Sequence, residues 1–138
     1  MKLRSLFKLD ARWYVVMAIM IMAFMTLNTE GNIVLRHTIL ICLISCTADF
    51  IIFFLLNRRR IFPLSALVSG LIISSVMAPT KWFYIAPLAA ILSKHIITYS
   101  GRHIFNPAGF GLLLANALWN IPLSWWLTTH ITIIIFFG

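Results

Sequence analysis

The run IVLRHTILICLISCTADFIIFFLL, residues 33–56, decides the structural class of this protein. It exceeds the ~20 mostly apolar residues that a helix needs to cross the hydrocarbon core of a bilayer. The run ends abruptly at a polar, strongly basic segment formed by Asn57, Arg58, Arg59 and Arg60. The sequence therefore predicts a membrane-spanning helix here, with a charged boundary at one end.

The rest of the chain is similarly apolar. Of its 138 residues, 62% are hydrophobic and 10% are charged, whereas soluble domains have ~45–50% and ~25%. Prolines and polar residues divide the apolar sequence into further runs, which are residues 13–28, 62–78, 82–98, 107–120 and 124–137. The last run, at ~14 residues, is marginal for a full span. We expect an all-α polytopic transmembrane protein, with five or six helices in a single domain over residues 1–138.

The basic residues predict the orientation. With the N-terminus in the cytoplasm, nine of the eleven lysines and arginines fall on the cytoplasmic side. Only Arg36 and Lys81 fall on the opposite side, as the positive-inside rule expects. This distribution explains the pI of 10.4 without a nucleic-acid partner. The expected location is the inner (plasma) membrane of a prokaryote, with the lipid bilayer as the surrounding partner.

Asp49 is the least expected residue of the run at 33–56. An ionised carboxylate inside a bilayer costs several kcal/mol, so Asp49 needs a partner or a proton. One interpretation makes it part of a cation or proton pathway. The alternative is a structural ion pair with Lys94 or Arg58, and the sequence leaves both open.

Small residues give further pathway candidates. Ser69 and Gly70 lie in the run at 62–78, and Asn106 and Gly109 lie at the start of the run at 107–120. Short or broken helices of this composition can line a substrate or ligand site near the middle of the bilayer. Close helix packing is the alternative interpretation.

Three basic residues could form a rim that binds an anion or a lipid headgroup. Lys94 ends one apolar run, and Arg102 and His103 follow in the next polar segment. Such a cationic cluster suits phosphate groups. The orientation signal alone would also produce it.

The sequence predicts no metal site. Cys42 and Cys46 lie one helical turn apart and are interpreted as small buried hydrophobic residues. They fit no disulfide or zinc pattern. The histidines fall on separate elements, at His37, His95, His103 and His130.

Several short motifs resemble a known family. Residues 62–71 read FPLSALVSGL, Ala78-Pro79 follows, and Ser93-Lys94-His95 precedes residues 101–111, GRHIFNPAGFG. Over roughly residues 60–120, the chain is similar to the NqrB/RnfD family of membrane subunits. These belong to the sodium-translocating NADH:quinone oxidoreductase and to the Rnf electron-transport complex. The resemblance implies a urea-transporter-like fold.

The chain also departs from this family. It offers about half of the helices, and it lacks the Gly-Ala-Thr type motif whose threonine carries covalent flavin, so covalent flavin is not expected. The resemblance implies a scaffold rather than an enzyme, working in a redox-linked ion-translocating complex as a homo-oligomer or with other membrane subunits. The alternatives are a stand-alone oligomeric channel or transporter for a small solute or ion, and a structural subunit of a larger assembly.

Overall fold

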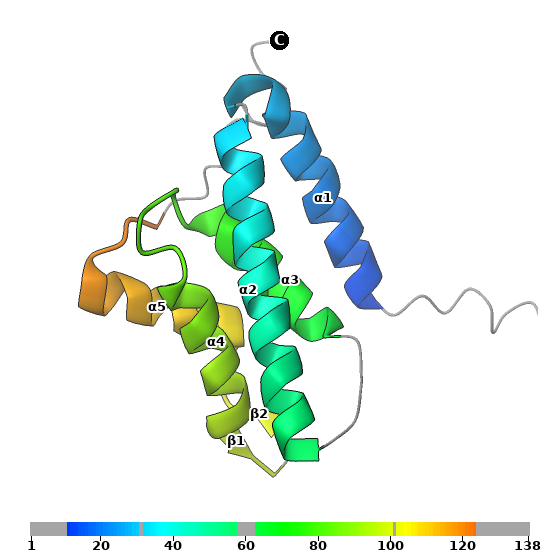
Figure 1. The fold of residues 1–138 in the computed structure, drawn as a ribbon, viewed down its shortest axis with the longest axis vertical. Helices are drawn as coiled ribbons and strands as arrows, with labels where there is room; N and C mark the ends of the chain where they lie inside the picture. Colours follow the sequence, from blue (N-terminus) through cyan, green and yellow to red (C-terminus); the bar gives the residue numbers. More distant parts are fainter. Residues whose placement is uncertain (1–10, 31, 58–62, 101, 124–138) are drawn as a thin grey trace, which may run out of the picture.

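The chain is mainly helical (Figure 1). The computed structural model describes residues 11–30, 32–57, 63–100 and 102–123. Its elements are α1 (Ala11–Glu30), α2 (Asn32–Asn57), α3 (Leu64–Val76), α4 (Ile85–Ile96), β1 (Thr98–Tyr99), β2 (Arg102–His103) and α5 (Pro107–Trp119). The sixth predicted helix, at residues 124–137, lies outside the described residues.

Helix α2 matches the predicted span. Its segment Asn32–Leu56 has 25 residues, and among the described residues it is the one helix long and apolar enough to cross a membrane. Only 17% of its most apolar window is buried inside the protein. Large side chains such as Leu43, Ile51 and Leu55 are exposed along it. The apolar surface of α2 therefore points mostly outward, unlike that of a soluble core helix.

Helices α3, α4 and α5 are all short; α3 and α4 are several residues shorter than the runs at 62–78 and 82–98, whereas α5 matches its run at 107–120 to within one residue. They have 13, 12 and 13 residues, which is about 18–20 Å of helix. Each is too short to cross a hydrocarbon core of ~30 Å alone. Hydrophobicity predicted where these helices lie but overestimated the length of α3 and α4, because apolar residues continue into the turns.

Local backbone geometry sets the ends of the short helices. The Pro63 carbonyl accepts the N–H groups of Ala66 and Leu67 at the start of α3, while Met77 is already extended, with φ −88° and ψ 123°. Residues 81–84 form turns before α4. Asn120 ends α5 in the left-handed conformation, with φ 49°, which asparagine tolerates better than most residues.

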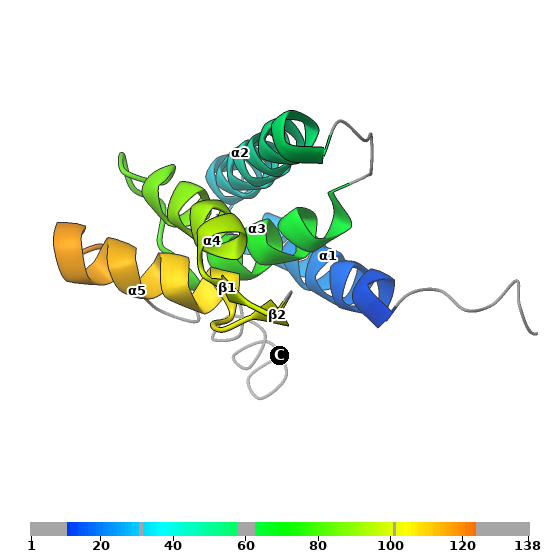
Figure 2. The same ribbon diagram turned by 90° about the horizontal axis from the view of Figure 1, so that it is seen from below.

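A small hairpin joins α4 to α5, in the segment expected to be a polar loop. Strands β1 and β2 pair antiparallel, with Thr98 opposite His103 and Tyr99 opposite Arg102. Ser100 in the connection has φ 50°. The hairpin reverses the chain, so that α5 returns across α4 (Figures 1 and 2).

The core lies where α2, α3, α4 and α5 meet. Figure 1 shows α4 beside α2 and α5 crossing α4 steeply, while α1 lies on the far side of α2 and α3. Many of the buried side chains are small, which lets the helix backbones approach closely. The main cluster consists of Ile41, Ile73, Val76, Met77, Ala86, Ala90, Ala108, Leu112, Ala115 and Ile121.

One glycine marks the closest helix contact. A methyl group at Gly111 of α5 would overlap the carbonyl oxygen of Ala86 and would lie 2.9 Å from Cβ of Ala90, both on α4. Only a hydrogen fits in this space. The α4–α5 contact therefore depends on the absence of a side chain at position 111.

Candidate functional site

The most distinctive polar feature of the interior is an ionic cluster between α2 and α4. Nζ of Lys94 lies 2.8 Å from both carboxylate oxygens of Asp49. Nε2 of His95 also lies 2.8 Å from Oδ1 of Asp49. One carboxylate of α2 thus holds two consecutive side chains from the end of α4. We call these three residues the Asp49 cluster.

The cluster is shielded from solvent. The side chain of Asp49 is 6% exposed, and those of Lys94 and His95 are 14% and 16% exposed. Hydrogen bonds to a charged group strengthen in such low-dielectric surroundings, and the loss of one partner becomes costly. The cluster is therefore a tight connection between two helices rather than a surface ion pair.

The carboxylate of Asp49 is the centre of the cluster. It accepts hydrogen bonds from the ammonium group of Lys94 and faces the Nε2 edge of the His95 ring. Hydrogen bonds of this length between charged groups are among the stronger ones in proteins. The cluster therefore fixes the end of α4 against one turn of α2.

The end of α4 favours basic residues at these positions. Lys94 and His95 occupy its last turn, where the exposed carbonyl groups of a helix attract positive charge. The hydroxyl of Ser93 is buried and donates to the carbonyl of Ala90 in the previous turn. The three residues Ser93-Lys94-His95 therefore combine one helix-internal contact with two contacts to α2.

The ion pair between Asp49 and Lys94 is one of the two pairings that the sequence suggested; the other candidate, Arg58, lies outside the described residues. His95 was not identified as a partner, because sequence spacing does not show which turn of α2 faces the end of α4. Lys94 was also expected on an anion-binding rim, but its ammonium group is already held by Asp49. Arg102 and His103 belong to β2, and their side chains lie outside the description.

The predicted pathway residues Ser69 and Gly70 are both buried on α3, and Gly70 faces α2. The hydroxyl of Ser69 donates to the carbonyl of Ser65. A methyl group at Gly70 would lie 3.0 Å from Oγ of Ser45 and 3.1 Å from Cα of Cys42. Gly70 therefore lies at a close contact between α3 and α2, whereas the hydroxyl of Ser69 is bound within its own helix.

The other predicted pathway residues lie on α5. The side chain of Asn106 accepts the N–H of Ala108 and caps the helix, with Pro107 in the first turn. Asn106 and Gly109 also line an open cavity of about 570 Å³ with Phe105 and Phe110. The described lining of this cavity does not include Asp49, Ser69 or Gly70. Among the described residues, the five candidates lie in three places: the Asp49 cluster, the buried part of α3 and the start of α5.

Two further polar groups, from His37 and Ser45, are buried on α2, the helix that carries Asp49. His37 was considered from the sequence only as a possible metal ligand, and Ser45 was not identified. The ring nitrogens of His37 and the hydroxyl of Ser45 find no hydrogen-bond partner among the described residues. His37 instead contacts the ring of Phe83 edge-on. Ser45 lies four residues before Asp49, which places the two side chains on one face of α2. This spacing is the sequence feature that could have identified Ser45. The other buried serines donate to carbonyl groups of their own helices, at Ser69, Ser74, Ser75 and Ser93.

Among the described residues, no group of three or more histidine, cysteine, aspartate or glutamate side chains could hold a metal ion. Comparisons with protein-family models, curated proteins and solved structures find no match.

Proposed function

We propose that this protein is an integral, polytopic membrane subunit of the NqrB/RnfD type, working as a scaffold in a redox-linked ion-translocating complex. The single observation that carries the proposal is the Asp49 cluster. A buried charge network in such an apolar chain is costly unless it serves a specific connection or an ion site.

The cluster contains the motif that suggested this family. Lys94 and His95 of Ser93-Lys94-His95 converge on one carboxylate of α2. The second motif, around Asn106, caps α5 and leads directly into the close contact at Gly111. The motif residues therefore cooperate in positioning α2, α4 and α5, as a scaffold requires.

The outer surface supports a membrane location and a role with partners. Large apolar side chains are exposed on α1, α2, α4 and α5, in keeping with contact to lipid or other subunits. Helices α3, α4 and α5 are each too short to cross a bilayer alone. A second copy or another membrane subunit would then complete a site between the two halves.

Within this proposal, the Asp49 cluster is the charged group that responds to the translocated ion or to its accompanying proton. Lys94 and His95 are the two side chains that hold this carboxylate in place. No covalent reaction is assigned to the chain itself, because the described residues offer no nucleophile activated by a base and an orienting group.

Affinity purification of the tagged chain from its native membrane tests the proposal. We expect redox subunits to copurify, with a visible absorbance spectrum of flavin or iron–sulfur groups in the captured complex. Purification without redox partners would contradict the proposal. Ion flux in liposomes that contain only this chain would then favour the stand-alone channel or transporter.

The Asp49→Asn variant tests the role of the cluster within the captured complex. We expect ion translocation per captured complex to fall, because the variant keeps the shape of residue 49 but removes its charge. Translocation is compared at equal amounts of assembled complex, so that the lower stability expected for this variant does not affect the comparison. Lys81→Gln is the matched control, since Lys81 is an exposed cation outside the cluster. Equal translocation in Asp49→Asn and Lys81→Gln would show that the Asp49 cluster takes no part in ion translocation.

A further inference from the structure

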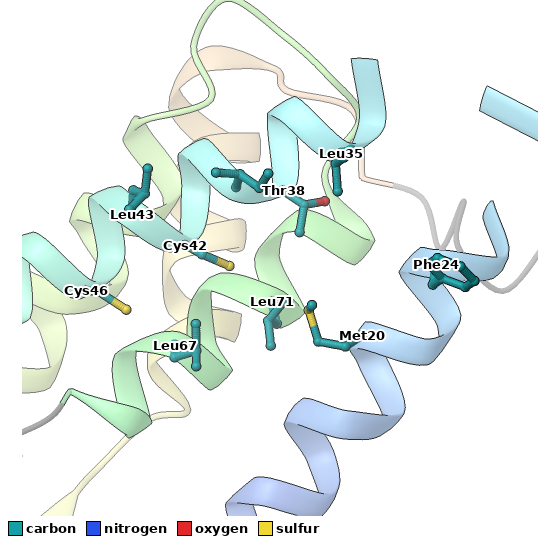
Figure 3. Close-up of a pocket in the computed structure, with 10 residues that line it drawn as sticks. Met20, Phe24, Leu35, Thr38, Cys42, Leu43, Cys46, Leu67 and Leu71 are labelled. Carbon is teal, nitrogen blue, oxygen red and sulfur yellow. The ribbon is translucent and has the colours of Figure 1, made fainter. Parts of the chain in front are cut away.

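Three sulfur-containing side chains from two helices line one apolar cavity. The cavity has a volume of about 290 Å³ and lies between α1, α2 and α3. Met20 of α1 and Cys42 and Cys46 of α2 contribute to its wall. Figure 3 shows their sulfur atoms directed toward the space between these helices. Most of the remaining wall is hydrocarbon, for example from Leu67 and Leu71.

Helix geometry places the two thiols close together. Residues four apart on a helix have Cβ atoms ≈ 5–6 Å apart on the same face. Both cysteines are free, and both are partly accessible rather than fully buried. A single ion lying between the two side chains could therefore contact both sulfur atoms. Met20 approaches from α1, and its flexible thioether can adjust to a bound ion.

We propose that Cys42, Cys46 and Met20 form a binding site for a soft monovalent metal ion of the Cu(I) class. Thiolate and thioether sulfur are the ligands that select Cu(I) among biological metals. Hard cations such as Mg²⁺ and Ca²⁺ instead require oxygen ligands. The described lining of the cavity contains one oxygen-bearing side chain, Thr38, and no carboxylate.

The charge of the complex also favours a monovalent ion. When Cu(I) binds, one thiol releases its proton to solvent and becomes a thiolate, while the second thiol and the thioether bind as neutral groups. The positive ion and the single thiolate cancel, so the occupied cavity carries no net charge. A neutral complex avoids the large cost of burying an isolated charge. No electron transfer is involved, because the ion enters and remains as Cu(I).

The site goes beyond the usual role of buried cysteines as small hydrophobic residues. The thiols border an open groove between the helices, where an ion can reach them from outside. The proposal does not depend on the protein belonging to a redox complex.

Silver binding tests the site, because Ag(I) is a redox-inert substitute for Cu(I). The purified full chain in detergent is mixed with excess glutathione and equimolar Ag(I), passed through a desalting column, and analysed for retained metal and free thiols. We expect one silver ion per chain and protection of both cysteines from alkylation. A site of two thiols and a thioether should retain silver against glutathione, whereas a lone cysteine should not.

Single substitutions then identify the ligands. Cys42→Ser and Cys46→Ser should each reduce silver retention by at least an order of magnitude, and Met20→Leu should reduce it by a smaller factor. Met17→Leu is the matched control, because Met17 is also exposed on α1 but does not line the cavity. Complete loss of silver to glutathione from the unchanged chain would overturn the proposal. So would retention that survives both cysteine substitutions, or alkylation that silver does not slow.

Discussion

The contacts of α4 with α2 and with α5 differ in physical nature. Toward α2, Lys94 and His95 reach a single carboxylate through hydrogen bonds of 2.8 Å. Toward α5, the contact rests on the missing side chain of Gly111, which lets the helix backbones meet. The first contact is specific in charge and the second is specific in shape. The position of α4 therefore depends on an ionic cluster toward α2 and on close backbone packing toward α5.

This difference determines how each contact fails. Removing one partner from a buried ionic cluster leaves the others without compensation for their lost hydration. Adding volume to a close helix contact pushes the backbones apart, and the structure can relax to reduce the cost. Substitutions at the two contacts should therefore differ in size and in whether a second substitution rescues them.

The largest expected effect is that of Asp49→Asn. We expect it to destabilise the protein by about 3 kcal/mol, because Lys94 loses its counter-charge while remaining largely buried. Tryptophan fluorescence during denaturation in detergent would measure the loss. The double variant Asp49→Asn with Lys94→Met should recover part of it, because the uncompensated ammonium group is gone. Strictly additive losses would show that the two residues do not interact.

Gly111→Ala should have the next largest effect. We expect a destabilisation of about 2 kcal/mol, because the new methyl group overlaps the backbone of α4. The same fluorescence assay would measure it. Gly109→Ala is the matched control, because the nearest atom to a methyl group at Gly109 is Cβ of Asn106 at 3.9 Å. Because alanine has a higher helix propensity than glycine, Gly109→Ala should not destabilise the protein. Equal losses at positions 109 and 111 would show that overlap with α4 is not the cause of the loss at Gly111.

The sequence predicted helix positions better than it predicted contacts. The apolar run at 33–56 marked α2, since length and hydrophobicity are local properties. Helix ends near Met77 and Ile85 were misplaced, because apolar side chains continue through these turns and only backbone geometry separates them from helix. The sequence offered Lys94 as one partner for Asp49, but it could not show that His95 joins the same carboxylate, because that depends on how α2 and α4 are aligned.

Asn106→Ala tests how far the steric contact depends on the start of α5. We expect a loss of about 1 kcal/mol, because the N–H of Ala108 loses its capping oxygen. Asn106→Asp should retain most of the stability, since its carboxylate can accept the same hydrogen bond. If the Ala and Asp variants unfold at the same denaturant concentration, the cap contributes nothing to the α4–α5 contact.

Ser45→Ala should have the smallest effect on the free energy of unfolding, and it is informative whether the substitution stabilises or destabilises the protein. Ser45 lies one turn from Asp49, but its buried hydroxyl finds no partner among the described residues. Removing an unsatisfied buried polar group can be neutral or stabilising. We therefore expect no loss in the denaturation assay. A loss of more than about 1 kcal/mol would reveal a hydrogen bond to this hydroxyl.

The hydrogen bonds of the α3 serines affect how readily this helix would partition into a bilayer. Hydropathy scales count each serine as polar, yet Ser69, Ser74 and Ser75 give their hydroxyl hydrogens to carbonyl groups of the same helix. These hydroxyl hydrogens are therefore no longer available for hydrogen bonds to water. A serine-rich helix of this kind would partition into lipid more readily than its composition suggests.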